Sequence, residues 1–444
     1  MIGAVSTQSG PVRILIVGGG YVGMYTALRL QKKLRGKQAQ ITVVDPQPHM
    51  TYQPFLPEAA AGSIEPRHVV VPLRRVLRRC QVLTGRVDKV EHATRRAWVS
   101  TSDGSTEILD YDLIVMAPGS IARTLPIPGL PEQGIAFKTV GEAIFLRNHV
   151  LSRMDIASVT RDTARRERLL TFLVVGGGYA GIEALAELED MARHATRYYQ
   201  GVAPEDMRWV LVEASNRVMP EVSPKMGVYT IERLTERGIQ VYLETRVDTM
   251  VGGNVRLSDG TEFATDTIVW TAGVKANPML ANTDLPLDER GRIRCTAQLQ
   301  VTGVSGAFSA GDCAAVPDLS KLDQDPTATC SPSAQHAVRQ AKVLADNVVA
   351  AVRGTKAKDY QHSYAGSVAS LGLYRGVADV YGVKLKGLPA WGMHRAYHLS
   401  RMPTTNRKAR ILVDWIMALV FRREVVALGQ INDPKADFDR AAAS

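Results

Sequence analysis

A glycine-rich motif occurs twice in this chain and constrains its fold more than any other feature. At residues 13–34, RILIVGGGYVGMYTALRLQKKL runs from a β-branched segment through Gly18, Gly20 and Gly23 into a helical pattern. In a strand–turn–helix unit with this G-x-G-x-x-G spacing, the glycines allow a tight turn, close approach of a pyrophosphate and close helix–strand packing. The N-terminus of the helix then presents backbone N–H groups to the phosphates. The motif predicts a dinucleotide site.

The strand predicted after this helix ends in an acidic residue. The segment ITVVD ends at Asp45, where a carboxylate can accept hydrogen bonds from ribose hydroxyl groups. A G-x-G-x-x-G pattern alone is weak evidence, because an ordinary glycine turn can match it. The flanking strand, helix and acid together make the dinucleotide site the better interpretation.

The same arrangement returns in LLTFLVVGGGYAGIEALAEL at residues 169–188, with Gly176, Gly178 and Gly181 after another apolar strand. The next strand, WVLVE, ends at Glu213. The chain is therefore predicted to hold two dinucleotides. An acid rather than an arginine at Glu213 suits a free 2′-hydroxyl and repels a 2′-phosphate, so we expect NADH rather than NADPH at the second site.

Three further strand ends carry glycines: YDLIVMAPGS at Gly119, TDTIVWTAGV at Gly273, and GAFSAGDCA at Gly311 and Asp312. A carboxylate at Asp312 could accept a hydrogen bond from the ribityl chain of a flavin. Alternating strands and helices of this kind predict an α/β fold with parallel sheets. We expect residues 12–120 and 290–355 to form one discontinuous nucleotide domain, with a second domain, residues 121–289, inserted into it.

Composition excludes several other classes of protein. The 444 residues are 45% hydrophobic and 22% charged, which is ordinary for a globular chain of two or three domains. No run of 18 apolar residues predicts a transmembrane helix, and residues 1–11 resemble a flexible arm. The four cysteines form no CxxC pattern, so we expect free thiols in a reducing cytosol and no metal site; they are Cys80, Cys295, Cys313 and Cys330.

The C-terminal region, residues 356–444, is both apolar and basic. From Ile411 to Phe421 every residue except Asp414 is apolar, and such a helix would be about 18 Å long against roughly 30 Å of bilayer hydrocarbon. Nine Lys or Arg and one acid between Lys384 and Arg423 supply +8 of the net charge of +10. Beside an apolar segment, this charge favours an anionic lipid surface over nucleic acid.

Two short helices are expected in this region, separated by the turn MPTTN. In the first, residues 388–402, His394, Arg395, His398 and Arg401 would form a basic stripe at helical spacing, which suits lipid headgroups. Thr405 or Asn406 could cap the second helix. In the second helix, the region of Trp415 and Phe421 would insert below the lipid headgroups. Asp414 would face Arg410 or the polar side of the helix. A dimer interface, or packing against the first domain, is the alternative use of this surface.

Paired G-x-G-x-x-G motifs, glycines at the later strand ends and the Gly-Asp pair together resemble the two-dinucleotide-binding-domain flavoprotein superfamily, which is also called pyridine nucleotide–disulfide oxidoreductase-like. The resemblance covers residues 12–350. It implies FAD in the discontinuous domain and NADH in the inserted one. Gln53 and Val87 complete the predicted cofactor contacts.

Two segments resemble one branch, the type II NADH:quinone oxidoreductases. MTYQPFLPEAAAGSIEPRHVVVPLR at residues 50–74 is similar to the Q-P-L-L-x-x-x-A-x-G segment of that branch, although Glu58 stands where many members have Gln. SAQHAVRQAKVLADNV at residues 333–348 is similar to its A-Q-x-A-x-x-Q helix. Pro118, next to Gly119, is a second departure from the pattern of that branch. The branch attaches to membranes through C-terminal amphipathic helices.

The resemblance also implies catalytic residues. Glu183, in the first turn after Gly181, would face the nicotinamide and flavin, although a carboxylate there also suits a helix N-terminus. Gln335 and Gln340 would border the flavin and the quinone, although both could belong to an ordinary helix face. His336 could titrate near neutral pH, but a single histidine is more often structural.

The sequence therefore predicts a peripheral NADH:quinone oxidoreductase that does not pump protons. Its cofactors would be FAD and NADH, its partners a membrane quinone, an anionic lipid surface and a second copy of itself, and its location the cytoplasmic face of the cell membrane. The alternatives are a redox-sensing interaction protein that uses the same two nucleotides, a sulfide:quinone oxidoreductase and a ferredoxin reductase. A sulfide:quinone oxidoreductase would need a pair of cysteines beside the flavin, and Cys330 has no evident partner.

Overall fold

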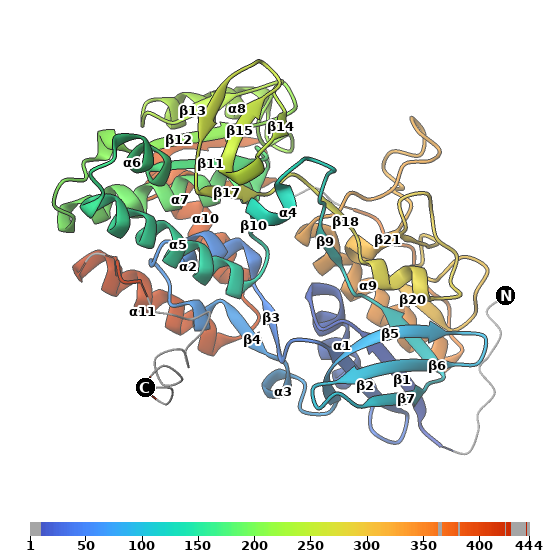
Figure 1. Cartoon of the computed structure of the whole chain (residues 1–444). Helices are drawn as coiled ribbons and strands as arrows, with labels where there is room; N and C mark the ends of the chain where they lie inside the picture. The colour runs from blue at the N-terminus through green and yellow to red at the C-terminus, as the bar shows by residue number, and fades with distance from the viewer. Residues whose placement is uncertain (1–9, 363–365, 381, 422, 428–440, 442–444) are drawn as a thin grey trace. The chain divides into compact units, whose positions relative to one another are not determined.

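The computed structural model describes residues 10–362, 366–380, 382–421, 423–427 and 441, which fall into two compact units (Figure 1). Unit 1 consists of Met1–Thr51, Val70–Ile121 and Val274–Tyr364. Unit 2 consists of Tyr52–Val69, Ala122–Gly273 and Ala365–Ser444. Each unit contains one of the two glycine motifs. The predicted arm lies outside the described residues except for its last two positions.

Unit 1 is built on a seven-stranded sheet with strand order β20-β8-β1-β2-β5-β6-β7. The pairs from β20 to β5 are parallel, and β5, β6 and β7 are antiparallel. The central strands β1 and β8 are continuous buried runs, as expected of parallel strands covered on both faces. The strands are β1 (Val12–Val17), β2 (Ala39–Asp45), β5 (Gln81–Glu91), β6 (Arg96–Thr101), β7 (Thr106–Asp110), β8 (Leu113–Met116) and β20 (Ala307–Ser309).

Two helices of unit 1 pack against each other, α1 (Tyr21–Lys33) and α9 (Ala334–Arg353). Asp346 on α9 joins them, because its carboxylate lies 2.7 Å from Arg29 Nε and 2.6 Å from Lys33 Nζ, both on α1. The helix that follows the first glycine motif is therefore fixed to the helix that carries Gln335 and Gln340.

Unit 2 repeats this plan with a five-stranded sheet of order β10-β17-β11-β12-β13 in which every pair is parallel. Strand β11 leads into the second glycine motif, as β1 leads into the first. Strands β11 and β17 are again fully buried runs. These two sheets confirm the predicted α/β class with two Rossmann-like domains. The strands are β10 (Gly134–Ala136), β11 (Thr171–Val175), β12 (Arg208–Val212), β13 (Gln240–Tyr242) and β17 (Thr267–Trp270).

The remaining elements of unit 2 surround its helix α7 (Tyr179–Ala195). Helix α2 (Leu56–Ala60) packs against α7 and α5. A small antiparallel sheet of β22, β23 and β24 precedes α10, which packs on it. The bounds are α5 (Val140–Val159), α6 (Thr163–Leu169), α8 (Pro224–Thr235), β14 (Val247–Thr249), β15 (Asn254–Leu257), β16 (Glu262–Ala264), β22 (Ser367–Ser370), β23 (Gly376–Val380), β24 (Val383–Lys386), α10 (Gly387–Arg401) and α11 (Thr405–Phe421).

The boundaries of the units differ from the predicted ones in three places, of which the third is residues 356–364, expected in the C-terminal region but part of unit 1. Residues 52–69, expected in the first domain, belong to unit 2, while residues 274–289, expected in the inserted domain, belong to unit 1. The first difference arises because α2 is a mostly apolar helix that is fully buried among the helices of unit 2. From residue 366 onward, the C-terminal residues that the structure describes are part of unit 2.

Both C-terminal helices form at the expected positions, but their faces differ from the prediction. On α10 the predicted basic stripe is turned inward at His394, which is 1% exposed, whereas Arg401 at its end is exposed. Met393, on the other side of the helix, is also exposed. Thr404, rather than Thr405 or Asn406, provides the cap of α11, because its Oγ1 accepts from the N–H of Arg407 at 3.3 Å. Among the described residues, no helix is long and apolar enough to cross a bilayer.

Asp414 and Trp415 on α11 also point elsewhere than expected. The carboxylate of Asp414 lies 2.6 Å from Nδ1 of His68 and accepts from the N–H of Glu65 at 3.1 Å, instead of facing Arg410. The indole N–H of Trp415 donates to Glu58 at 2.8 Å, so this ring faces α2. Phe421 is exposed, which insertion into lipid would require.

Candidate functional site

The first glycine turn in unit 1 has a backbone that only glycine can form. Gly18 has φ of +99°, and a Cβ there would lie 2.2 Å from the carbonyl oxygen of Ala117. Gly20 is the N-cap residue of α1, where no side chain caps the first N–H groups and a Cβ would meet no atom within 4 Å. The start of α1 is therefore open toward a ligand and offers uncapped donors, as a pyrophosphate requires.

Asp45 lies beside this turn. Its Oδ2 accepts from the N–H of Gly19 at 2.6 Å, and its Oδ1 accepts from the N–H of Gln47 at 2.7 Å. Burial raises the pKa of Asp45, and these two hydrogen bonds oppose that effect only in part. The structure thus brings the predicted ribose-binding acid next to the predicted phosphate-binding turn.

Unit 2 has the same geometry at its own motif. Gly176 has φ of +111°, and Gly178 caps α7 with open space in front of it and no side-chain cap. Glu213 accepts from the N–H of Gly177 at 2.6 Å through Oε2 and from the N–H of Ser215 at 2.7 Å through Oε1. Both nucleotide sites therefore have the turn, the donors and the acid that a dinucleotide needs.

The Gly-Asp turn of unit 1, at Gly311 and Asp312, is hydrogen-bonded to Gln340 and Ser120. Oε1 of Gln340, which is 1% exposed, accepts from the N–H of Gly311 at 2.7 Å. The hydroxyl of Ser120, the residue after Gly119, donates to Oδ2 of Asp312 at 2.6 Å. These contacts fix the carboxylate that we assign to the flavin, so the residues of unit 1 fit FAD.

The other predicted residues are more dispersed. Gln335 is half-buried and accepts from Arg339 at 3.1 Å on the same face of α9. Val87 is buried on β5, and Gly273 is exposed with φ of +87°. Gln53 belongs to unit 2, where its side-chain N–H₂ donates to the carbonyl of Lys138 at 3.3 Å.

His336 has a structural environment. Its Nδ1 lies 3.0 Å from the hydroxyl of Tyr360, and its ring stacks on His362 with 4.0 Å between the centroids. Burial lowers the pKa of His336 to about 4, and the neighbouring His362 lowers it further. The imidazole is therefore neutral at physiological pH, which argues against a proton-donating role for this residue.

Glu183 lies on α7, one turn from the uncapped N-terminus of this helix, and is buried at 6% exposure. Its Oε1 accepts from the N–H of Ser370 at 2.9 Å and lies 3.1 Å from Nε2 of His394. Burial lowers the pKa of His394, but Glu183 and Glu58 outweigh burial, so the pKa of His394 is raised overall. Sequence reasoning identified Glu183 but missed both of its partners.

A second buried acid, Glu58 on α2, was noticed in the sequence only as a departure from the resembled branch. Its Oε2 accepts from Arg395 Nη2 at 2.7 Å and from Trp415 Nε1 at 2.8 Å. The guanidinium of Arg395 also lies between two indole rings, 4.0 Å from the centroid of Trp391 and 4.7 Å from that of Trp415. This pair joins α2, α10 and α11 within unit 2.

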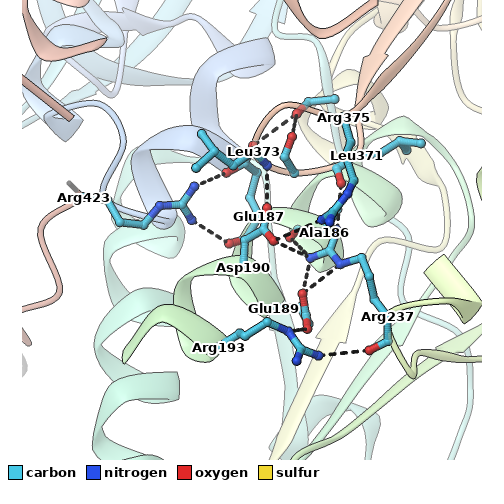
Figure 2. Close-up of polar contacts among 12 residues, drawn as sticks. Ala186, Glu187, Glu189, Asp190, Arg193, Arg237, Leu371, Leu373, Arg375 and Arg423 are labelled. Carbon is cyan, nitrogen blue, oxygen red and sulfur yellow. Dashed lines mark hydrogen bonds and ion pairs between the residues drawn. The ribbon is translucent and has the colours of Figure 1, made fainter. Parts of the chain in front are cut away.

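The far end of α7 is held by a network of charges (Figure 2). Arg237 is paired with both Glu189 and Asp190 and donates to the carbonyl of Leu371 at 2.7 Å. Asp190 also accepts from the N–H of Leu373. Because residues 371–373 follow directly on β22, the network fixes the end of that strand, and with it Ser370, against α7.

Comparison with known proteins agrees with this geometry. The family model described as pyridine nucleotide-disulphide oxidoreductase matches residues 12–341. The chain belongs to that family. Its predicted superfamily is thereby confirmed, and with it the pairing of FAD and a nicotinamide nucleotide that the two motifs indicate.

Relatives of known name fall in the resembled branch. The chain is 28% identical to the type II NADH:quinone oxidoreductase Ndh of Mycobacterium tuberculosis, over 93% of this chain and 89% of that protein. It is also 28% identical to a type II NADH:quinone oxidoreductase of Staphylococcus epidermidis, over 85% and 92%. The solved structure of NDH2 from Plasmodium falciparum in complex with NADH has a TM-score of 0.85 at 17% identity, covering 94% of this chain and 99% of that one. That similarity shows a common fold.

Proposed function

We propose that this chain is a type II NADH:quinone oxidoreductase, with FAD in unit 1 and NADH in unit 2. The observation that carries the proposal is the pair of uncapped glycine turns, each with a hydrogen-bonded acid at the end of the next strand. Bound FAD supplies the chemistry that accepts a hydride from NADH and passes two electrons to the quinone. The reaction needs no metal and moves no proton across a membrane.

The chain's own residues bind and orient the reactants. In unit 2 the first turn of α7 holds the pyrophosphate of NADH, and Glu213 accepts from its adenosine ribose. Glu183, one turn further along the same helix, would lie near the nicotinamide end. In unit 1 Asp45 accepts from the ribose of FAD and Asp312 from its ribityl chain, while Gln340 and Gln335 border the flavin and the quinone.

The second C-terminal helix is the proposed membrane-attachment device. The apolar residues on its exposed side range from 47% to 75% exposed, an unusual concentration for a helix that contacts only water. They are Leu412, Val413, Ile416, Met417, Leu419, Val420 and Phe421. Arg407, Lys408 and Arg410 precede them on α11, where they can engage anionic headgroups. The protein would attach at the cytoplasmic face of the cell membrane without crossing it, as a homodimer.

The cysteines do not favour a sulfide:quinone oxidoreductase. All four are unbridged, and burial raises the pKa of Cys80, Cys313 and Cys330 to about 11 in each case. A persulfide relay needs a thiolate nucleophile, and these thiols stay protonated at neutral pH.

A single-turnover experiment tests the function. NADH is mixed anaerobically with the FAD-loaded protein, and the reduced flavin is then mixed with a short-chain quinone. Rapid reoxidation supports the oxidoreductase. A reduced flavin that persists with a charge-transfer band in the presence of the quinone would instead favour the redox-sensing interaction protein.

A further inference from the structure

Quinone reduction by NADH consumes one proton from water. The balance is NADH + H⁺ + quinone → NAD⁺ + quinol, in which the hydride brings two electrons and one hydrogen, and solvent supplies the other hydrogen. If the proposed function is right, some part of the chain must bring this proton to a site shielded from water. The following inference rests on that function.

Two buried carboxylates lie one helical turn apart on α7. Glu187 is 1% exposed, and Glu183, four residues earlier, is 6% exposed. Ser370, at the end of β22, contacts both of them. Its N–H donates to Glu183 Oε1 at 2.9 Å, and its hydroxyl donates to Glu187 Oε1 at 3.1 Å. This single residue therefore spans the two acids.

The charges around these acids leave room for one proton. Within unit 2 there are three buried acids, Glu58, Glu183 and Glu187. Arg395 is paired with Glu58, and Arg423 is paired with Glu187. His394 contacts Glu183, and Asp190, which also acts on Glu187, is paired with Arg237. With a neutral imidazole the three acids exceed the two arginines by one negative charge, which a proton on Glu187 or His394 balances.

The electrostatics of both candidates agree with this. Burial raises the pKa of Glu187 to about 7, although the charge of Arg423 opposes the effect. The pKa of His394 is also raised, because its acidic neighbours outweigh its burial. Glu187 is thus the group of this cluster that can gain and lose a proton near neutral pH.

A groove leads from the surface of unit 2 to this cluster. It has a volume of about 490 Å³, and its lining includes Asp190, Tyr374, Trp391 and Arg423. Nη2 of Arg423 in turn lies 3.4 Å from Oε2 of Glu187, as Figure 2 shows. The groove therefore reaches the guanidinium that faces the buried carboxyl group.

We propose that Glu187 is a positioning residue for proton uptake, which takes a proton from water in the groove and passes it through the hydroxyl of Ser370 toward Glu183. In the structure the hydroxyl of Ser370 donates to Glu187, and it must first turn its hydrogen toward Glu183. Oγ of Ser370 then accepts the proton from the carboxyl of Glu187 as the hydroxyl gives its own proton to the carboxylate of Glu183. Glu187 is then reprotonated from the groove. No electron moves in these steps.

The test separates the two half-reactions in the full-length, FAD-loaded protein. Glu187→Gln should reduce its flavin with NADH as fast as the unaltered protein, because hydride transfer takes no proton from the cluster. Its reoxidation by menadione should be slower by roughly tenfold or more, with a larger solvent deuterium isotope effect. Ser370→Ala should act in the same direction, and Glu187→Asp should restore part of the rate. Glu205→Gln, on the exposed surface, is the charge-matched control.

Two further readouts do not depend on turnover. Infrared difference spectra between about pH 6 and pH 8 should contain a protonated-carboxyl band that Glu187→Gln removes. In Arg423→Met the same band should titrate at higher pH, because the opposing positive charge is gone. The Arg423→Met spectrum decides the matter if Glu187→Gln reoxidises slowly only because it has lost its fold, since Arg423→Met keeps the carboxyl group.

The proposal is overturned if Glu187→Gln and Ser370→Ala are reoxidised by menadione at the unaltered rate and with an unaltered pH profile. It is also overturned if the infrared band is unchanged in Glu187→Gln. Failure of the proposed function looks different, since the unaltered protein would then reduce its flavin with NADH but would not be reoxidised by menadione.

Discussion

The backbone N–H of Gly177 donates to Oε2 of Glu213 across 2.6 Å, the same contact that Gly19 makes with Asp45 in unit 1. In each unit the acid at the end of one strand is thus tied to the glycine turn that precedes the helix. Glu213 therefore holds the turn in place, and we propose that it has a second role, to direct negative charge at the adenosine ribose of NADH.

This double role shapes a prediction about nucleotide preference. Glu213→Gln keeps an oxygen that accepts from Gly177 but removes the charge, so it should weaken the discrimination against NADPH without loosening the turn. Glu213→Arg should go further and raise the ratio of kcat/KM for NADPH to that for NADH by roughly tenfold or more. Steady-state rates with both nucleotides measure the effect. An unchanged ratio in both variants would show that Glu213 does not face the ribose, and Glu205→Arg, at an exposed position, controls for surface charge.

The ion pair between Glu58 and Arg395 gives a prediction about stability. The side chains are only 2% and 12% exposed, so Arg395→Met leaves a buried carboxylate without its cation and should cost about 3 kcal/mol. The double variant Glu58→Gln with Arg395→Met removes both charges and should recover much of that loss. Thermal unfolding of the three proteins provides the comparison.

Lys384→Met is the matched control for this series, because Lys384 is exposed. Its melting temperature should equal that of the unaltered protein. If Arg395→Met melts at the same temperature as this control, the buried pair does not stabilise unit 2.

These two contacts also illustrate what the sequence could and could not predict. Asp45 and Glu213 are 26 and 36 residues from the glycines that they bind, within a strand–turn–helix–strand unit whose geometry is nearly fixed. The local sequence pattern therefore predicted that both acids lie beside the glycine turns. Glu58 and Arg395 are 337 residues apart, and no local rule brings such a pair together.

The misread face of α10 has the same origin. At helical spacing, His394, Arg395, His398 and Arg401 predict a basic stripe that suits lipid headgroups. Glu183 and Glu58, the acidic partners of His394 and Arg395, are each notable in the sequence, but no local pattern links them to α10. Glu58 stands in an otherwise apolar segment between Pro57 and Ala59, and a carboxylate so placed is a signal that a buried cation must come from elsewhere.

Burial of His149 on α5 leads to a prediction about pH. Its Nε2 lies 2.9 Å from the carbonyl oxygen of Asp266 and 3.0 Å from Thr267 Oγ1. Burial and the charge of Arg153 lower its pKa from 6.5 to about 4. An unfolded chain then binds this proton at a higher pH than the folded chain, so stability is full above pH 6.5 and is lost as the pH falls toward 4.

The corresponding variant is His149→Asn, which does not titrate. Between about pH 6.5 and pH 4, the melting temperature of this variant should fall less steeply than that of the unaltered protein. The difference corresponds to at most about 1.4 kcal/mol per pH unit in the free energy of unfolding. Melting curves across this range check the slope. Parallel slopes for the two proteins would mean that His149 is protonated in the folded state.

The exposed apolar side of α11 gives the last prediction. Deleting residues 388–444 is a poor test of membrane attachment, because α10 carries His394 and Arg395, which neutralise buried acids of unit 2. Leu419→Asp with Phe421→Asp is better, since these side chains are 68% and 75% exposed. Inserting each apolar side chain into lipid is worth about 1.5–3 kcal/mol, so the double variant should lose roughly 100-fold or more in affinity for vesicles that contain anionic lipid.

Cosedimentation with such vesicles measures the loss, and NADH oxidation with a water-soluble artificial acceptor should stay unchanged. Ile108→Asp is the control, because Ile108 is similarly exposed at 54% but lies on β7 in unit 1. If the double variant sediments with the vesicles as well as this control does, α11 is not the attachment surface. Its apolar side would then have to be covered by protein, and the natural candidate is the second subunit of the predicted homodimer, because an isologous contact buries the same patch on both copies.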